Sequence, residues 1–206
     1  MTTRRHVLTL AASGLAAALA AGALGTGAAR AQGAVDDIVL GDPNAPVEVI
    51  EYASFTCPHC ADFHRDSFPA FRRDYIDTGK VRFVYREVYF DRYGLWASMI
   101  ARCAGPDRYF GVTELLYQNQ ADWARQADPA LVAESLKRIG AQAGLTPEAA
   151  DACLQDGEKA QALVAWYEAN AARDGVRSTP SFLIDGELHS GAMSLEQIGA
   201  LVDAAI

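Results

Sequence analysis

Two cysteines separated by two residues are the side chains in this sequence with the clearest chemistry. They lie in the segment Ser54–Cys60, which reads Ser-Phe-Thr-Cys-Pro-His-Cys. This segment follows an apolar, strand-like stretch, Val47–Ala53, and leads into a stretch with helical spacing. Cysteines at this spacing can open and close a small disulfide ring, or they can supply half of a zinc site. The spacing alone therefore predicts redox chemistry or metal binding.

The two cysteines are expected to have different roles. A thiolate is the nucleophile in disulfide exchange, and Cys57 should lie at the exposed N-terminus of the helix, where unpaired N–H groups favour negative charge. Cys60 lies one turn further in and suits the resolving role. His59 would stabilise the Cys57 thiolate if it were protonated or donated a hydrogen bond; otherwise it is an ordinary exposed histidine. Pro58 restricts the ring and suits a first helical turn.

The other two cysteines, Cys103 and Cys153, are 50 positions apart in a region of helical pattern. Zinc usually takes a second close pair of ligands, so we expect no metal. The expected arrangement is a structural disulfide that closes a long loop, and the alternatives are two buried free thiols or a second redox pair that tunes the first. A static disulfide within the C-x-x-C segment is a further alternative to a redox-active one.

The remaining histidines and the tryptophans carry weaker signals. His64 and His189 have no chemical context in the sequence, and we expect them to be surface or hairpin residues. Trp96, Trp123 and Trp166 are expected to belong to a helical core or its rim.

The first 31 residues have the pattern of an export signal. Arg4 and Arg5 precede an apolar Ala/Leu/Gly-rich run, and Ala29–Ala31 forms a small-x-small cleavage site. The pattern resembles a twin-arginine signal, and an ordinary Sec signal is the alternative. We therefore expect cleavage after Ala31 and a periplasmic protein, in an oxidising compartment that favours disulfides.

Removal of residues 1–31 would make the protein strongly acidic. This segment contains three arginines and no acidic residue, so residues 32–206 carry 15 basic and 26 acidic side chains and a formal net charge of −11. A surface of this charge repels nucleic acid and anionic lipid. We therefore expect no nucleic-acid partner.

The order of apolar patterns predicts an α/β sheet with an inserted helical subdomain. A strand at Val47–Ala53, a helix interrupted near Ser67–Phe68 by Pro69, and a strand at Val81–Val88 form a βαβ unit, so the two strands should be parallel. The Asp185-Gly186 turn predicts a hairpin near the end, followed by a last helix. Between these parts, helical patterns cover 93–104, 106–120, 129–143, 147–155 and 157–173.

The segment Phe55–Cys60 resembles the active site of the DsbA family of periplasmic dithiol oxidases. The resemblance extends over essentially the whole chain from about Gly41 to Ala205. It implies a thioredoxin-like fold with an all-helical insertion between the second and third core strands. The expected division is a signal peptide at 1–31, a polar leader at 32–46, a thioredoxin-like domain at 47–90 and 174–206, and the insertion at 91–173.

The resemblance also implies roles for residues outside the C-x-x-C segment. Thr179-Pro180 matches the cis-proline loop that faces the C-x-x-C in thioredoxin-like proteins and pairs with an extended substrate chain; the alternative is a trans proline at a strand edge. Threonine before this proline differs from the valine of the best-known oxidases of the family and matches several isomerases. Glu51 matches an acidic residue beneath the resolving cysteine, with a role in proton exchange with Cys60. Alternatively, Glu51 points to solvent or pairs with Arg86.

The predicted function is a periplasmic oxidation of reduced, unfolded exported proteins through Cys57 and Cys60, with no cofactor. The family resemblance implies reoxidation by a DsbB-type membrane partner. The polar leader is too short for the N-terminal dimerisation domain of family isomerases, which favours a monomer and the oxidising role. The alternatives are a disulfide isomerase or reductase on the same fold, and a redox-inert chaperone that binds peptides in the same groove.

Overall fold

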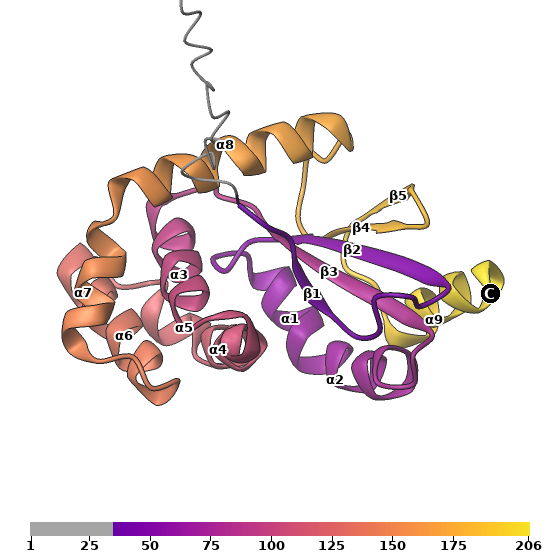
Figure 1. Cartoon of the computed structure of the whole chain (residues 1–206), viewed down its shortest axis with the longest axis horizontal. Helices are drawn as coiled ribbons and strands as arrows, with labels where there is room; N and C mark the ends of the chain where they lie inside the picture. The colour runs from indigo at the N-terminus through magenta and orange to yellow at the C-terminus, as the bar shows by residue number, and fades with distance from the viewer. Residues whose placement is uncertain (1–34) are drawn as a thin grey trace, which may run out of the picture. The chain divides into compact units, whose positions relative to one another are not determined.

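A computed structural model describes residues 35–206, and the expected signal peptide lies outside the described residues. Figure 1 shows a sheet flanked by helices, with further helices gathered beyond one end of it. The strands are β1 (Ile38–Leu40), β2 (Val47–Ala53), β3 (Val81–Glu87), β4 (Ser181–Ile184) and β5 (Glu187–Ser190). The helices are α1 (Pro58–Asp66), α2 (Phe68–Phe71), the π-helical turn η1 (Arg72–Ile76), α3 (Arg92–Cys103), α4 (Pro106–Gln118), α5 (Gln120–Trp123), α6 (Pro129–Gln142), α7 (Pro147–Gln155), α8 (Gly157–Arg173) and α9 (Leu195–Ala205).

The sheet has the strand order β1-β3-β2-β4-β5. Strands β2 and β3 pair in parallel, as predicted, and the other pairs are antiparallel. The apolar strand β2 lies at the centre, and Glu51 pairs in register with Tyr85 on one side and Phe182 on the other. The register therefore places a carboxylate in the middle of a buried sheet.

The two faces of the sheet are covered by different helices. Alternate residues of the central strands, such as Val49, pack into a large core with α1, α2 and α9, which lie on one side of the sheet in Figure 1. The intervening residues, such as Ile50, pack into a smaller core with Tyr167 and Ala171 from the end of α8 on the other face. Because side chains of a strand alternate between its two faces, each central strand contributes residues to both cores.

The helical block between β3 and β4 was predicted well, and its helix boundaries agree with the sequence patterns within about two residues. Asp128 and Thr146 cap their helices with side-chain hydrogen bonds, and Ser194 forms the expected capping box at α9. Pro69 falls in the first turn of α2, where the first helix is interrupted as predicted. The fold class is therefore confirmed.

Three local features differ from the sequence prediction or add to it. The predicted polar leader contains the short strand β1, which pairs with β3 at the sheet edge. This strand could not be predicted, because three residues are too short for a periodic pattern. The chain after α2 forms a π-helical turn, and the short helix α5 follows α4 after a break at Asn119.

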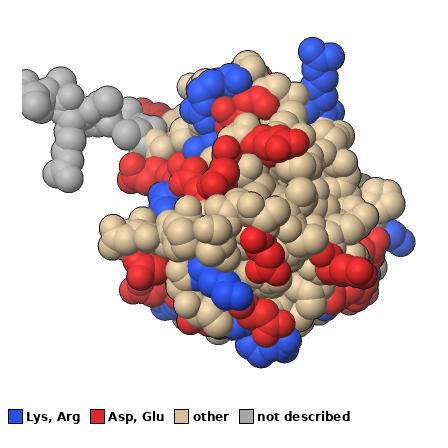
Figure 2. All heavy atoms as spheres, turned by 90° about the vertical axis from the view of Figure 1, so that its right-hand side faces the viewer, with Lys and Arg blue, Asp and Glu red and all other residues tan. Residues whose placement is uncertain are grey.

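A disulfide joins Cys103 at the end of α3 to Cys153 in α7, with their Cα atoms 6.4 Å apart. It crosslinks two helices of the inserted block, as the sequence suggested. Among the described residues, no helix has the length and apolar character needed to span a membrane. Figure 2 shows acidic and basic side chains interspersed over the face that carries the C-terminal helix α9.

Candidate active site

Cys57 is the N-cap residue of α1, with an extended backbone before the helix begins. Its thiol is half-buried, and both Cys57 and Cys60 are free thiols in this structure. The pKa of Cys57 falls from 9.0 to about 5, chiefly because the Cys60 thiol donates a hydrogen bond to the thiolate. Thr179 and the backbone N–H groups at the start of the helix lower this pKa further, against partial burial, which raises it.

Cys60 lies one helical turn below Cys57 and is fully buried. Burial raises the pKa of its thiol, and the hydrogen bond with Cys57 and the nearby charge of Glu51 raise it further. The two cysteines thus differ as the sequence predicted, with one stabilised as a thiolate and the other held as a thiol. A thiolate with a lowered pKa is both a nucleophile at neutral pH and a good leaving group.

The Thr179-Pro180 peptide bond is cis, as the family resemblance implied. The Cys57 thiol donates a hydrogen bond to the carbonyl oxygen of Thr179 at 3.5 Å. The hydroxyl oxygen of Thr179 is buried and has no hydrogen-bond partner of good geometry within residues 35–206. The loop that precedes β4 therefore faces the reactive sulfur, although the helical insertion separates the two in sequence.

The side chain of His59 points away from the thiols. It is 76% exposed, and its Nδ1 lies 3.9 Å from Asp62 Oδ2. Its contribution to the site comes from its backbone N–H, which lowers the pKa of Cys57. At this position the main chain rather than the ring therefore stabilises the thiolate.

Glu51 is fully buried and does not pair with Arg86. Instead its Oε2 lies 2.9 Å from Nε2 of His64, and these side chains are 0% and 3% exposed. The prediction that His64 is a surface or hairpin residue was wrong, whereas His189 does lie in the hairpin strand β5. Arg86 bonds Asp37 and Asp174 on the opposite side of the sheet.

Two residues that were not predicted from the sequence hold the active-site segment in place. Gln120 is buried at the start of α5, and its Nε2 donates to the carbonyl oxygens of Phe55 at 2.8 Å and Cys57 at 2.9 Å. Asp91 accepts a hydrogen bond from the Thr56 hydroxyl at 2.7 Å while it caps α3. Neither contact could be predicted from local patterns, because both join the C-x-x-C segment to distant helices.

The fold and the C-x-x-C site define a DsbA-like protein of the thioredoxin family, and the chain belongs to that family. The family model described as Thioredoxin matches residues 33–204. The structure resembles α-DsbA1 of Wolbachia pipientis with a TM-score of 0.75 and 31% identity, over 84% of this chain and 92% of that one. It also resembles a protein-disulfide isomerase from Novosphingobium aromaticivorans, with a TM-score of 0.72 and 25% identity over 81% of this chain and 97% of that one.

A protein of Rickettsia typhi with the provisional name protein-disulfide oxidoreductase RT0103 is 34% identical over 172 residues, which cover 83% of this chain and 62% of the relative. The chain thus spans about three-fifths of the length of the curated relatives it matches.

Proposed function

We propose that this protein is a periplasmic thiol:disulfide oxidoreductase that introduces disulfide bonds into reduced, unfolded exported proteins. The observation that carries the proposal is the lowered pKa of Cys57, about 5, beside a resolving cysteine whose pKa is raised. A stabilised thiolate favours the reduced form of the pair, so the oxidised form is a stronger oxidant. The proposed direction of electron flow is therefore from the substrate to the protein.

The reaction proceeds through a mixed disulfide. A substrate thiolate attacks Sγ of Cys57, a bond forms between the two sulfurs, and the Cys57–Cys60 bond breaks with its electron pair on Cys60. Cys60 then takes up a proton. A second substrate thiol loses its proton and attacks the substrate sulfur of the mixed disulfide, and Cys57 leaves as a thiolate. Two substrate thiols are oxidised to one disulfide, and the protein is reduced by two electrons.

The loop at Thr179 supports docking of the substrate as an extended chain. Its carbonyl oxygen lies within hydrogen-bond distance of the reactive sulfur, so a substrate strand paired with this loop would bring its cysteine to Cys57. Such main-chain recognition suits many unfolded client sequences. Reoxidation by a quinone-linked membrane partner of the DsbB type would complete the cycle, with the protein acting as a monomer without a cofactor.

The oxidase proposal is tested by refolding reduced, denatured ribonuclease A with the oxidised protein, in parallel with an assay of insulin reduction. We expect the protein to restore ribonuclease activity in stoichiometric amounts and to reduce insulin more slowly than it oxidises ribonuclease. Cys57→Ser should abolish both reactions. Full activity of Cys57→Ser in either assay would exclude the mechanism.

A disulfide isomerase or reductase is the second candidate, because Thr179 precedes the cis proline and the similar Novosphingobium protein is named an isomerase. This function predicts that the reduced protein rearranges scrambled ribonuclease, whereas an oxidase does so poorly. A redox-inert chaperone predicts no exchange in any of these assays.

A further inference from the structure

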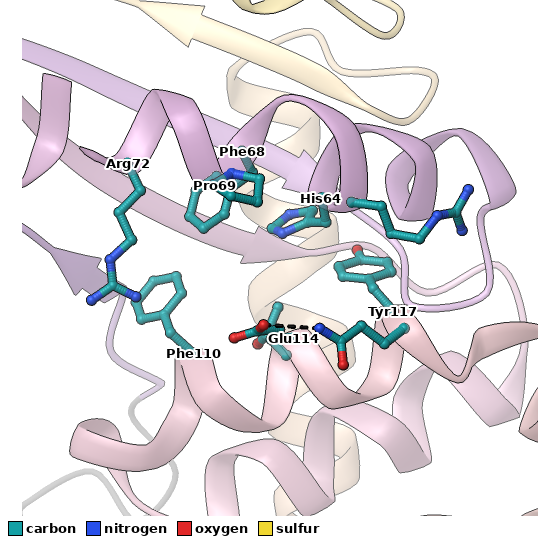
Figure 3. A pocket seen from close by; sticks show the side chains of 10 residues that line it. His64, Phe68, Pro69, Arg72, Phe110, Glu114 and Tyr117 are labelled. Carbon is teal, nitrogen blue, oxygen red and sulfur yellow. Dashed lines mark hydrogen bonds between the residues drawn. The ribbon is translucent and has the colours of Figure 1, made fainter. Parts of the chain in front are cut away.

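A cavity of about 420 Å³ lies between two parts of the chain (Figure 3). One wall is α1 with its continuation into α2 and η1, and the other wall is α4. Phe68, Phe110 and Tyr117 form apolar parts of its wall, and Arg65, Arg72 and Glu114 bring charges to it. The hydroxyl oxygen of Thr113, also in the wall, is buried without a hydrogen-bond partner in the described part of the chain. The cavity is therefore polar enough to hold water.

His64 connects this cavity to the carboxylate beneath Cys60. Its ring lines the cavity, as Figure 3 shows, and stacks on Tyr117 with ring centroids 4.4 Å apart. Its Nε2 lies 2.9 Å from Glu51 Oε2. The other carboxylate oxygen, Oε1, is buried without a hydrogen-bond partner among residues 35–206. Glu51 thus has one carboxylate oxygen that is bonded to His64. Its other oxygen has no partner in the described chain and could exchange a proton with a group such as Cys60.

The proposed reaction creates a need for a proton at this place. When a substrate attacks Cys57, Cys60 leaves as a thiolate inside the protein, where burial and the charge of Glu51 both disfavour it. Glu51 is fully buried as well, so it cannot exchange protons with bulk solvent directly. A buried acid that acts once in every turnover needs a partner that restores its proton.

We propose that His64 relays protons between the solvent of this cavity and Glu51, and that this path serves Cys60. The inference rests on the proposed disulfide exchange. In the forward step Glu51 passes a proton to the Cys60 thiolate and is left as a carboxylate. The His64 ring then takes up a proton from the cavity and passes the proton on its Nε2 to Glu51, so that one proton moves in net from the cavity to Cys60. In reoxidation the same steps run in reverse, and Cys60 loses its proton by this path. His64 is a positioning and relay residue, because it acts on Cys60 only through Glu51.

Several ionisable groups from different elements lie around the relay. Cys60 and Arg65 belong to the same helix, Arg72 to η1, Glu51 to β2 and Tyr85 to β3. Tyr117 and Glu114 come from α4, and the hydroxyl groups of Tyr85 and Tyr117 lie 2.6 Å apart. The pKa values of both tyrosines are raised by burial, so these hydroxyl groups stay protonated at neutral pH. Of these groups, His64 is the one that both contacts Glu51 and lines the cavity.

The test compares His64→Gln and His64→Phe in single-turnover oxidation of a reduced peptide between pH 5.5 and 8.5. Gln can keep the hydrogen bond to Glu51 but cannot relay a proton, and Phe keeps only the packing. Because general acid–base contributions are large, we expect both variants to be slower than wild type by about 10-fold or more, with an altered pH profile. His189→Gln, a histidine of the hairpin outside the site, is the matched control and should behave as wild type.

Chemical rescue separates a relay from a structural role. His64→Ala enlarges the cavity, and free imidazole should restore its rate in a saturable way, whereas it should leave His189→Gln unchanged. The relay is overturned if His64→Gln stays within twofold of wild type across the pH range, or if imidazole fails to accelerate a folded His64→Ala. If His64→Ala does not fold, the pH profile of His64→Gln decides. Absence of exchange by the wild type itself would instead refute the proposed function.

Discussion

The thiol of Cys57 and the carbonyl oxygen of Thr179 lie 3.5 Å apart, although 122 positions separate them in the chain. The whole helical insertion lies between them in sequence, and the pairing of β4 with β2 brings them together. The reactive sulfur and the loop that we propose as the docking edge for extended chains therefore lie side by side. The reactivity of Cys57 and the nature of the loop can be tested separately.

The lowered pKa of Cys57 predicts a reactive thiolate well below neutral pH. Alkylation of the reduced protein by iodoacetamide should be near its maximum at pH 7 and should fall as the pH is lowered through about 5. An unperturbed cysteine, with a pKa of about 8.5, would be only about 3% thiolate at pH 7. The rate is measured by mass spectrometry, and a titration midpoint near that of an ordinary cysteine would contradict the prediction.

The partner variants provide the controls for this experiment. Cys60→Ala removes the hydrogen bond that lowers the pKa of Cys57 most, so this pKa should rise towards its ordinary value. In Cys57→Ala the remaining Cys60 should resist alkylation from pH 5 to 8, because burial raises its pKa and covers its sulfur.

Thr179→Val tests the hydroxyl beside the thiolate while keeping the shape of the side chain. Thr179 is among the groups that lower the pKa of Cys57, and its hydroxyl has no other partner in the described chain. We expect the pKa of Cys57 to rise in this variant but to stay below that of the Cys60→Ala variant. The thiolate absorbance at 240 nm as a function of pH measures the pKa in both variants. An unchanged pKa in Thr179→Val would show that the Cys60 thiol and the backbone N–H groups suffice to lower it.

Glu51→Gln should slow exchange without changing the reactivity of Cys57. Glu51 is not among the groups that shift the pKa of Cys57, but its charge raises the pKa of Cys60. Loss of its proton exchange should reduce the rate of peptide oxidation by about 10-fold or more. A normal oxidation rate would show that Glu51 has no part in the mechanism. An altered alkylation profile of Cys57 would show that Glu51 acts on Cys57 rather than on Cys60.

The fold could largely be predicted from the sequence because its signals are local. Periodic apolar residues, proline at first helical turns and the Asp185-Gly186 turn each depend on a few neighbouring residues, and the structure agrees with them. The short strand β1 could not be predicted, because its pairing with β3 is a tertiary effect.

The candidate site was predictable only in part. The two thiols follow from C-x-x-C spacing, and the cis proline and Glu51 followed from the family resemblance. His64 was misjudged, although its position four residues after Cys60 places both on one face of α1, directed towards the sheet. The contact with Glu51 depends on how α1 packs across β2, which no local pattern reveals.

The disulfide between Cys103 and Cys153 should act on stability rather than on the active site. It closes a loop across 50 positions, so its loss in the Cys103→Ala/Cys153→Ala variant should cost about 4 kcal/mol of unfolding free energy in the chain-entropy model. Urea unfolding measures this change. A shift in the Cys57 titration in the same variant would instead indicate a second redox pair that tunes the first.

Whether the Cys57–Cys60 pair takes electrons from its substrates depends on its redox potential, which a glutathione redox titration of residues 32–206 measures. The fraction reduced is followed by quenched alkylation and mass spectrometry. We expect a potential well above the value of about −270 mV for thioredoxin, towards the value of about −120 mV for DsbA. A potential at or below that of thioredoxin would contradict it.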